Sequence, residues 1–265
     1  MSKSTSESTI EVADSASVPL WSAVIQVFKR PFPLTMRVVW PLLVLMALVL
    51  AYVFLPEFTA QRSQHWPELA LDRMAPVQPA WAVIYGSHLL FVLFPALILR
   101  EEEQIRRTLW AIVMVWAVAV AFFVMFPTVI HRPAPDQDRG FFSWSLRVVY
   151  AADRPYNCFP SLHVAHAFVS AFACHPIHRG VGLGCGVWAT LIGISTVFTK
   201  QHYVADVLAG VLLAWLAWRL FLRGYSSPTI PRCEKRAAPV LLLATIGCWS
   251  IVVAGFGSYY WLCGR

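Results

Sequence analysis

The sequence predicts an all-α fold, a polytopic integral membrane helix bundle with six core helices and a seventh helix at the C-terminal end. Three observations lead to this fold class. Hydrophobic residues make up 58% of the 265 residues and charged residues only 13%, which is more apolar and less charged than a soluble domain. Seven apolar stretches each approach the ~20 residues that cross the hydrocarbon core of a bilayer. The 12 Trp and 8 Tyr suit the interface between lipid and water.

The N-terminal part of the chain is expected to lie outside the bundle. Residues 1–17 are polar and poor in aromatic side chains, which predicts a disordered tail, and they lack the layout of a cleavable signal peptide. In residues 18–36, Trp21, Ile25 and Phe28 recur at helical spacing and two basic residues follow. This pattern is typical of an amphipathic helix that lies in the membrane interface.

The membrane-spanning helices are placed where apolar runs reach bilayer length. Residues 37–227 form the predicted catalytic core, and residues 228–265 contain the extra C-terminal helix. The fourth and fifth runs are interrupted by polar residues or glycines, so they are the least regular. The predicted spans are 38–56, 80–99, 108–127, 161–177, 181–199, 203–222 and 238–262.

The longest connection, residues 128–160, is rich in Pro, Arg and aromatic residues, and loops of this length are often functional. Within it, the segment FFSWSLRVVY predicts a short amphipathic helix on the bilayer surface. Its aromatic side chains fit two roles equally well, the lining of a lipid entrance and anchoring at the interface. They are Phe141, Phe142, Trp144 and Tyr150.

The distribution of Lys and Arg predicts the orientation of the chain. With the N-terminus inside, 13 of the 21 basic residues lie on the inner side and eight on the outer side. The positive-inside rule therefore places the N-terminus in the cytoplasm and the 128–160 loop outside, in a bacterial inner membrane. Topology also explains the net charge of +7, because the basic residues lie between apolar runs and not on one face that could bind nucleic acid. The lipid bilayer is the expected partner, and the oligomeric state stays open.

Polar segments from three distant parts of the sequence fall at the outer ends of predicted helices. They hold Arg132 after the third span, Ser161 and His163 at the start of the fourth, and His202 and Asp206 at the start of the sixth. Ionisable side chains are costly inside a membrane, so such residues mark functional sites. A helix bundle can bring the three segments together at one membrane face.

Each of these residue types has a role in phosphoryl transfer. His202 and Asp206 are four residues apart, so Asp206 can accept a hydrogen bond from one ring nitrogen of His202. The other nitrogen then keeps a lone pair, which makes His202 a nucleophile toward phosphorus. His163 can protonate the leaving oxygen. Arg132 suits phosphate oxygens, and Ser161 caps a helix whose N-terminus attracts anions. These roles predict a phosphate bound between two histidines.

Other interpretations of the same residues are weaker. His166 lies one turn below His163, where packing or support is favoured over catalysis. A metal site is disfavoured because no Cys or Glu joins the histidines and Asp206 at a familiar zinc spacing. Ser161 lacks the G-x-S-x-G motif of a hydrolase nucleophile.

The remaining histidines and cysteines give little signal. Cys158 and Cys263 would share one side of the membrane, but nothing else supports a disulfide between them. Four histidines are interpreted as helix caps or interfacial residues, namely His65, His88, His175 and His178.

The three polar segments resemble the motifs of the type-2 phosphatidic acid phosphatase (PAP2) superfamily, which are K-x6-R-P, P-S-G-H and S-R-x5-H-x3-D. Arg132 begins the R-P of the first motif, and the second is present as PSLH, ending at His163. In the third, ST is followed after five residues by His202 and after three more by Asp206, so the spacing matches in full. The resemblance covers residues 120–212, the middle third of the chain, and the combination is far more specific than any single motif.

Three positions depart from the family pattern. Met125 stands where the first motif has Lys, Leu162 replaces the Gly of the second, and Thr196 replaces the Arg of the third. Two phosphate-binding cations of the general pattern are therefore missing, and Lys200 is a candidate to supply one. PSLH together with T-x-x-H-Y-x-x-D is similar to the branch that includes inositol phosphorylceramide synthases.

The resemblance implies a six-helix core, a phosphohistidine at His202, His163 as acid and then base, and no cofactor or metal. The predicted function is a membrane-embedded lipid phosphatase or phosphotransferase acting on the phosphate ester of a membrane lipid. The acceptor stays open between water and a lipid alcohol. A lipid transporter or scramblase is disfavoured because the polar groups cluster at one face and no inverted repeat is visible. A non-catalytic membrane partner is disfavoured because His163, His202 and Asp206 are all retained.

Overall fold

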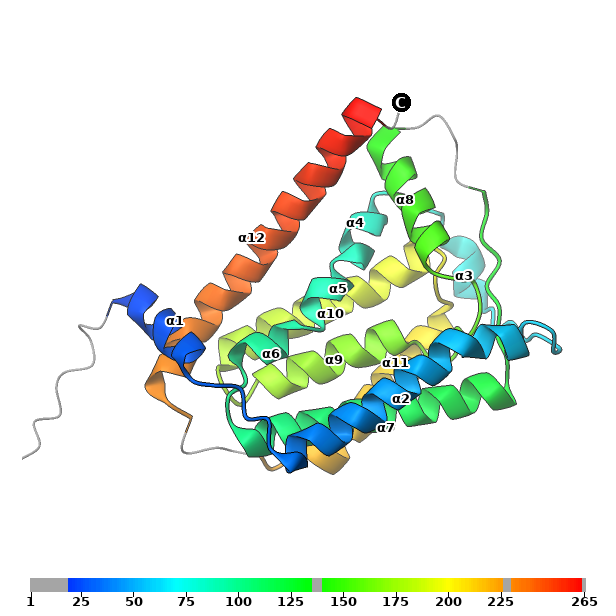
Figure 1. Ribbon diagram of the computed structural model, residues 1–265. Coiled ribbons are helices and arrows are strands. Elements are labelled where there is room, and N and C mark those ends of the chain that lie inside the picture. The colour runs from blue at the N-terminus through cyan, green and yellow to red at the C-terminus, as the bar shows by residue number, and fades with distance from the viewer. Residues whose placement is uncertain (1–18, 135–139, 226–229, 264–265) are drawn as a thin grey trace, which may run out of the picture.

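The structure, a computed structural model, describes residues 19–134, 140–225 and 230–263. In these ranges the chain is helical, with isolated β-bridges and no strand (Figure 1). The predicted tail, residues 1–17, lies outside the described residues. The helices are α1 (Leu20–Lys29), α2 (Met36–Thr59), α3 (Ala70–Met74), α4 (Trp81–Gly86), α5 (His88–Phe91), α6 (Phe94–Ile98), α7 (Glu102–Met125), α8 (Gly140–Ala152), α9 (Leu162–Cys174), α10 (Arg179–Phe198), α11 (Val204–Ala217), the π-helical η1 (Trp218–Leu222) and α12 (Arg232–Cys263).

Five segments of the described chain are long and apolar enough to cross a bilayer, and they are α2, α7, α10, α11 with η1, and α12. They confirm the prediction of an all-α integral membrane helix bundle. Their lipid-facing surfaces account for the many exposed apolar side chains, such as Leu43 on α2 and Ile251 on α12. The segment FFSWSLRVVY is helical as predicted, within α8.

The span predicted at 80–99 is wrong as a single helix, because the structure divides it into α4, α5 and α6. Pro95 has no N–H to continue the helical hydrogen bonds of α5, so a new helix begins beside it. At the first break, the Ser87 hydroxyl donates to the carbonyl of Ile84 at 2.6 Å and accepts from Trp188 Nε1 at 2.8 Å. The Ser87 hydroxyl and the Ile84 carbonyl at the break therefore both have hydrogen-bond partners inside the bundle.

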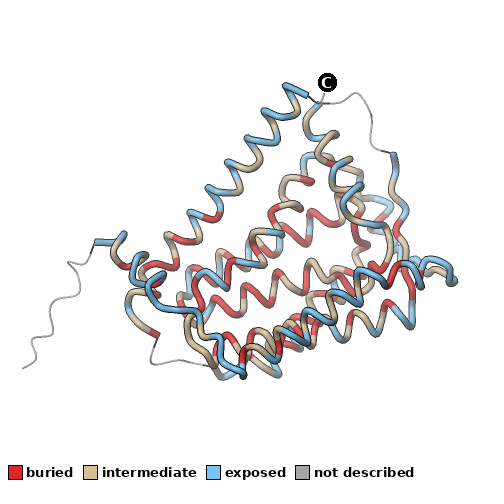
Figure 2. Tube along the Cα trace, in the orientation of Figure 1, coloured by how far each residue is buried: buried red, intermediate tan, exposed pale blue. Residues whose placement is uncertain are grey.

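Helix α9 is the central element of the bundle, and it packs against α7, α10 and α11. It is shorter than the predicted span 161–177, and Figure 2 shows it buried along most of its length, unlike α12. Small buried side chains such as Ala167 and Ala171 let the neighbouring helices approach closely. One very close approach is at Gly210 of α11, where an added Cβ would lie 2.7 Å from the carbonyl oxygen of Ser161.

Helices α8 and α12 extend away from this core and meet near their tips (Figure 1). Their contact is aromatic, with the Trp144 ring of α8 lying 6.1 Å from Phe256 and 5.9 Å from Tyr260 of α12. At its other end α12 packs against α1, where Arg30 forms an ion pair with the buried Glu234. Helix α12 is thus held at both ends, and between them Trp249 Nε1 donates to the carbonyl of Val83 at 3.1 Å.

We expect Gly210→Ala to destabilise the protein, because the new methyl group would collide with the backbone at the start of α9. Overpacking of this kind costs about 1–3 kcal/mol. Gly255→Ala is the matched control, since a Cβ there meets nothing within 4 Å. Thermal unfolding in detergent should show a lower midpoint for Gly210→Ala alone. Equal midpoints for the two variants would contradict the close approach.

Candidate functional site

The start of α9 and the start of α11 lie together at one end of the bundle. The backbone N–H of Ser161 donates to the carbonyl of Asp206 at 3.1 Å, which joins the two segments directly. The 128–134 segment reaches the same place, because the N–H of Cys158 donates to Thr128 Oγ1 at 2.8 Å. All three polar segments identified in the sequence therefore meet in the structure.

His163 and His202 face each other at this meeting point. Nδ1 of His163 lies 3.2 Å from Nε2 of His202, and their ring centroids are 5.4 Å apart. His202 is buried, whereas about a quarter of the His163 side chain is exposed. Two imidazoles from separate motifs thus share one cleft, with His163 on its more open side.

A backbone carbonyl orients His202. Its Nδ1 lies 3.0 Å from the carbonyl oxygen of Cys158, while the expected partner, Asp206 Oδ2, is further away at 3.5 Å. A carbonyl can only accept, so Nδ1 carries the hydrogen and Nε2 keeps the lone pair. Asp206 Oδ2 also accepts the N–H of Tyr203 at 2.9 Å, so the same carboxylate caps α11. Asp206 therefore adds negative charge beside His202 and fixes the helix that carries it.

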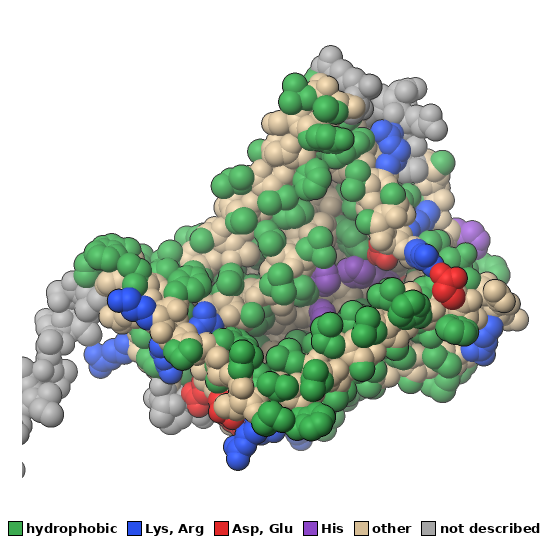
Figure 3. Space-filling view, viewed as in Figure 1, with side chains coloured by type: hydrophobic (Ala, Val, Ile, Leu, Met, Phe, Trp, Pro, Cys, Tyr) green, Lys and Arg blue, Asp and Glu red, His purple; other side chains and the backbone are tan. Residues whose placement is uncertain are grey.

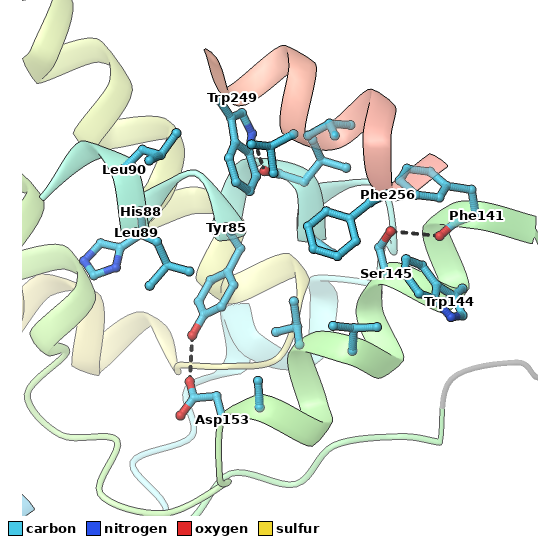
Figure 4. Close-up of a pocket in the computed structure, with 18 of the residues that line it drawn as sticks. Tyr85, His88, Leu89, Leu90, Phe141, Trp144, Ser145, Asp153, Trp249 and Phe256 are labelled. Carbon is cyan, nitrogen blue, oxygen red and sulfur yellow. Dashed lines mark hydrogen bonds between the residues drawn. The ribbon is translucent and has the colours of Figure 1, made fainter. Parts of the chain in front are cut away.

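Two residues that sequence reasoning missed complete the surroundings of His163. The hydroxyl of Tyr85 lies 2.8 Å from His163 Nε2 and donates to Asp153 Oδ2 at 2.6 Å (Figure 4). Tyr85 comes from the broken second span and Asp153 from the end of α8. For Asp153, the one available sequence signal was that it is an acidic residue inside a long loop. No sequence signal marked Tyr85.

Arg132 ties two segments of the site together. Its guanidinium donates to the carbonyl of Asp153 at 2.6 Å and also to the side-chain oxygen of Gln201. It further lies 5.0 Å from the ring centroid of Tyr150, whose pKa burial raises to about 12, so a neutral ring faces the cation. The 153–154 and 200–201 segments are held side by side in this way.

Ser161 and Lys200 have structural partners as well. The Ser161 hydroxyl caps α9 by accepting the N–H of Val164 at 3.3 Å, and the residue is fully buried. Lys200 Nζ donates to the carbonyls of Asp72 and Ala75, each at 2.8 Å. The ammonium group of Lys200 is thus engaged with the 72–75 segment.

The cleft contains two amide donors that the sequence analysis did not single out. Gln201 and Asn157 are both buried and line a small cavity together with His163 and His202. In the described part of the chain, neither Nε2 of Gln201 nor Nδ2 of Asn157 has a hydrogen-bond partner. The orientation of the Gln201 amide is fixed, because its oxygen accepts a hydrogen bond from Arg132. Both N–H groups are therefore free to donate to an acceptor bound in this cavity.

A row of aromatic and imidazole rings continues behind His163. The His88 ring lies 4.7 Å from the His163 ring, and His166 accepts from Trp116 Nε1 at 2.9 Å. His88 is therefore part of the bundle interior beside the site, where a helix cap or interfacial position was expected. In the ranges the structure describes, no three His, Cys, Asp or Glu side chains are arranged to hold a metal ion.

Cys158 does not provide a nucleophile, although its carbonyl contacts His202. Burial, and after it the Asp206 carboxylate, raise the pKa of the Cys158 thiol well above its usual range, and only a thiolate is strongly nucleophilic. Cys158 and Cys263 are both free thiols, so the structure has no disulfide between them.

An apolar chamber of about 530 Å³ leads to this cleft. It lies between α4, α5, α8 and α12, and Tyr85 and Asp153 line its polar end (Figure 4). His163 lines the chamber as well. Figure 3 shows histidine side chains at the base of a hollow in a largely hydrophobic surface. The site is thus accessible from the apolar flank of the molecule.

A comparison with protein families gives one match. The family described as the PAP2 superfamily matches residues 59–220, which is more than half of the chain. The matched region contains both histidines, Asp206, Tyr85 and Asp153, and it ends before α12. No curated protein and no solved structure matches significantly.

We predict that the neutral form of His202 carries its hydrogen on Nδ1. The reason is the carbonyl of Cys158, which can accept a hydrogen bond but cannot donate one. Nitrogen-15 NMR of histidine-labelled protein in nanodiscs would measure this, with His202→Ala identifying the signals. A hydrogen on Nε2 would contradict the assignment.

Proposed function

Because the chain belongs to the PAP2 superfamily, an assignment that indicates a phosphatase- or phosphotransferase-type enzyme, we propose that it cleaves the phosphate ester of a membrane lipid through a phosphohistidine at His202. The observation that carries this proposal is the 3.2 Å contact between the two histidines, with the Nε2 lone pair of His202 at its centre. A fixed tautomer makes this nitrogen a nucleophile without the loss of a proton.

The reaction proceeds in two steps. His202 Nε2 forms a bond to phosphorus, the bond from phosphorus to the lipid oxygen breaks, and the lipid oxygen takes a proton from His163. An acceptor hydroxyl then attacks phosphorus, His163 removes its proton, and the N–P bond breaks. Water as acceptor gives a phosphatase. A lipid alcohol gives headgroup transfer, as in the inositol phosphorylceramide synthase-like branch.

Tyr85 and Asp153 support the acid form of His163. A protonated His163 donates from Nε2 to the Tyr85 hydroxyl, which in turn donates to the Asp153 carboxylate. The positive charge is thereby partly balanced while Nδ1–H is directed at the leaving oxygen. Substrate must first replace the direct contact between the two histidines, because phosphorus takes the position next to His202 Nε2.

The phosphate oxygens are held by amide donors in place of the two missing motif cations. Gln201 Nε2 and Asn157 Nδ2 supply hydrogen bonds, and the N-terminus of α9 behind Ser161 supplies partial positive charge. Arg132, which donates to Gln201, adds its positive charge beside the phosphate. Lys200, the residue before Gln201, adds positive charge at longer range. In this proposal the site faces the outer side of the membrane and the N-terminus lies in the cytoplasm, the orientation that the positive-inside rule favours.

Purified protein in detergent, with EDTA present, should release phosphate from at least one of a panel of lipid phosphates. His202→Ala should lower the rate by at least about a thousandfold, since the nucleophile is lost. His175→Ala is the matched control, because this exposed residue lies at the opposite end of α9, and it should keep wild-type activity.

The outcomes separate the two acceptors. If phosphate is not released, the panel is repeated with phospholipid donors and lipid alcohol acceptors, and transfer there identifies a synthase. Turnover by His202→Ala at the wild-type rate would refute the phosphohistidine. No turnover in either assay would refute the proposed function.

Gln201→Glu should lower kcat/KM by at least about tenfold, the scale expected for loss of a hydrogen bond to a charged group. Glutamate keeps an oxygen for Arg132 and replaces the N–H donor with an oxygen that repels phosphate. Gln78→Glu is the control, because it too keeps its acceptor role, toward Trp81, on the protein surface. Unchanged kcat/KM in Gln201→Glu would show that Gln201 does not bind the phosphate.

A further inference from the structure

Helix α12 forms one wall of the apolar chamber although it lies outside the region matched by the family. Trp249, Val252, Val253 and Phe256 line the chamber, and this spacing of three and four residues places them on one helix face. Ile251 lies on another face and is 74% exposed. The same helix therefore presents one apolar face to the chamber and another to the surrounding lipid.

The opposite walls are equally apolar. Helix α8 contributes Trp144 and Val148, and the 82–90 segment contributes Val83 and Leu89. The one serine on these walls, Ser145, already donates to the carbonyl of Phe141 at 2.9 Å. A volume of about 530 Å³ falls within the range of small-molecule sites. Away from the end formed by Tyr85, His88, Asp153 and His163, the walls offer mainly hydrocarbon contacts.

The chamber adjoins the catalytic cleft at shared lining residues. Asp153 and His163 line both the chamber and the small polar cavity that contains His202 and Gln201. A molecule that fills both spaces has a hydrocarbon portion on one side of His163 and a charged group on the other. A lipid phosphate has this chemistry.

We infer that the chamber between α8 and α12 binds the hydrocarbon chain of the substrate, and that α12 thereby sets which chains are accepted. This inference rests on the proposed function for the identity of the charged group. It deepens that function by assigning a substrate-binding wall to a helix outside the matched core. Two sources of hydrocarbon, a straight acyl chain and a branched isoprenoid chain, share the required chemistry.

The first test fills the chamber. Val253→Trp should lower kcat/KM for long-chain lipid phosphates at least about tenfold, because several methylene groups lose their apolar contacts. The value for a short-chain phosphate ester, which does not reach the α12 wall, should stay within about twofold of wild type. Ile251→Trp, on the lipid-facing side of the same helix, should change neither value. Acyl and isoprenoid phosphates are assayed in parallel, and the series with the larger loss identifies the chain type.

The second test needs neither a variant nor turnover. A long-chain lipid phosphate carrying a diazirine at the end of its chain is photolysed with wild-type protein in detergent. We expect labelling of α8 and of the 249–256 segment of α12, reduced by excess unlabelled lipid phosphate. This readout stays informative if wild-type protein shows no turnover in either the release or the transfer assay, a result that would refute the proposed function alone.

Three results would overturn the inference. Equal losses for short and long chains in Val253→Trp, together with labelling that excludes α12, would show that this helix only supports the fold. Unchanged values for both substrates would show that the chain lies elsewhere. Labelling spread over all lipid-facing helices and insensitive to competitor would mean that ordinary bilayer lipid fills the chamber.

Discussion

The candidate site depends on one close approach, the packing of the start of α11 against the start of α9. Gly210 allows it by lacking a side chain, and the hydrogen bond from Ser161 N–H to the carbonyl of Asp206 fixes its register. Since His163 lies in the first turn of α9 and His202 lies just before α11, a small change in helix separation would part their nitrogens. Small residues along α9 extend the same tight packing through the bundle, where van der Waals contact rather than hydrophobic burial holds membrane helices together.

Some of this arrangement could be predicted from the sequence because it follows from local spacing. The all-α bundle follows from apolar runs of bilayer length, and the polar residues at helix ends indicated which segments would meet. The capping of α9 by Ser161 is likewise a local property. These features depend on neighbours within a few residues, which a sequence shows directly.

The parts that could not be predicted depend on contacts between distant segments. The carbonyl of Cys158 lies closer to His202 Nδ1 than Asp206 does, and a backbone group leaves no mark in the residue pattern. Tyr85 reaches His163 from α4, a short helix in a region where hydropathy alone predicted one continuous span. The orphan amide of Gln201 becomes visible only once Arg132 is seen to occupy its oxygen.

The two sides of His163 differ in chemistry. Toward His202 the surroundings are buried, polar and small in volume, whereas toward α12 they are apolar and large. A single residue between such environments can contact the reacting bond while the rest of a substrate stays in hydrocarbon. The matched core provides the first environment, and the additional C-terminal helix completes the second.

The double use of Asp206 has a consequence for interpreting related sequences. Its carboxylate accepts the N–H of Tyr203 at the start of α11, so the residue is needed for a correctly begun helix whether or not any reaction takes place. A relative that had lost its activity would still be under pressure to keep this aspartate for folding. His202, by contrast, is held by a carbonyl that every residue at position 158 would supply. The histidine, and not the aspartate, is therefore the position whose loss would distinguish an inactive relative from an active one.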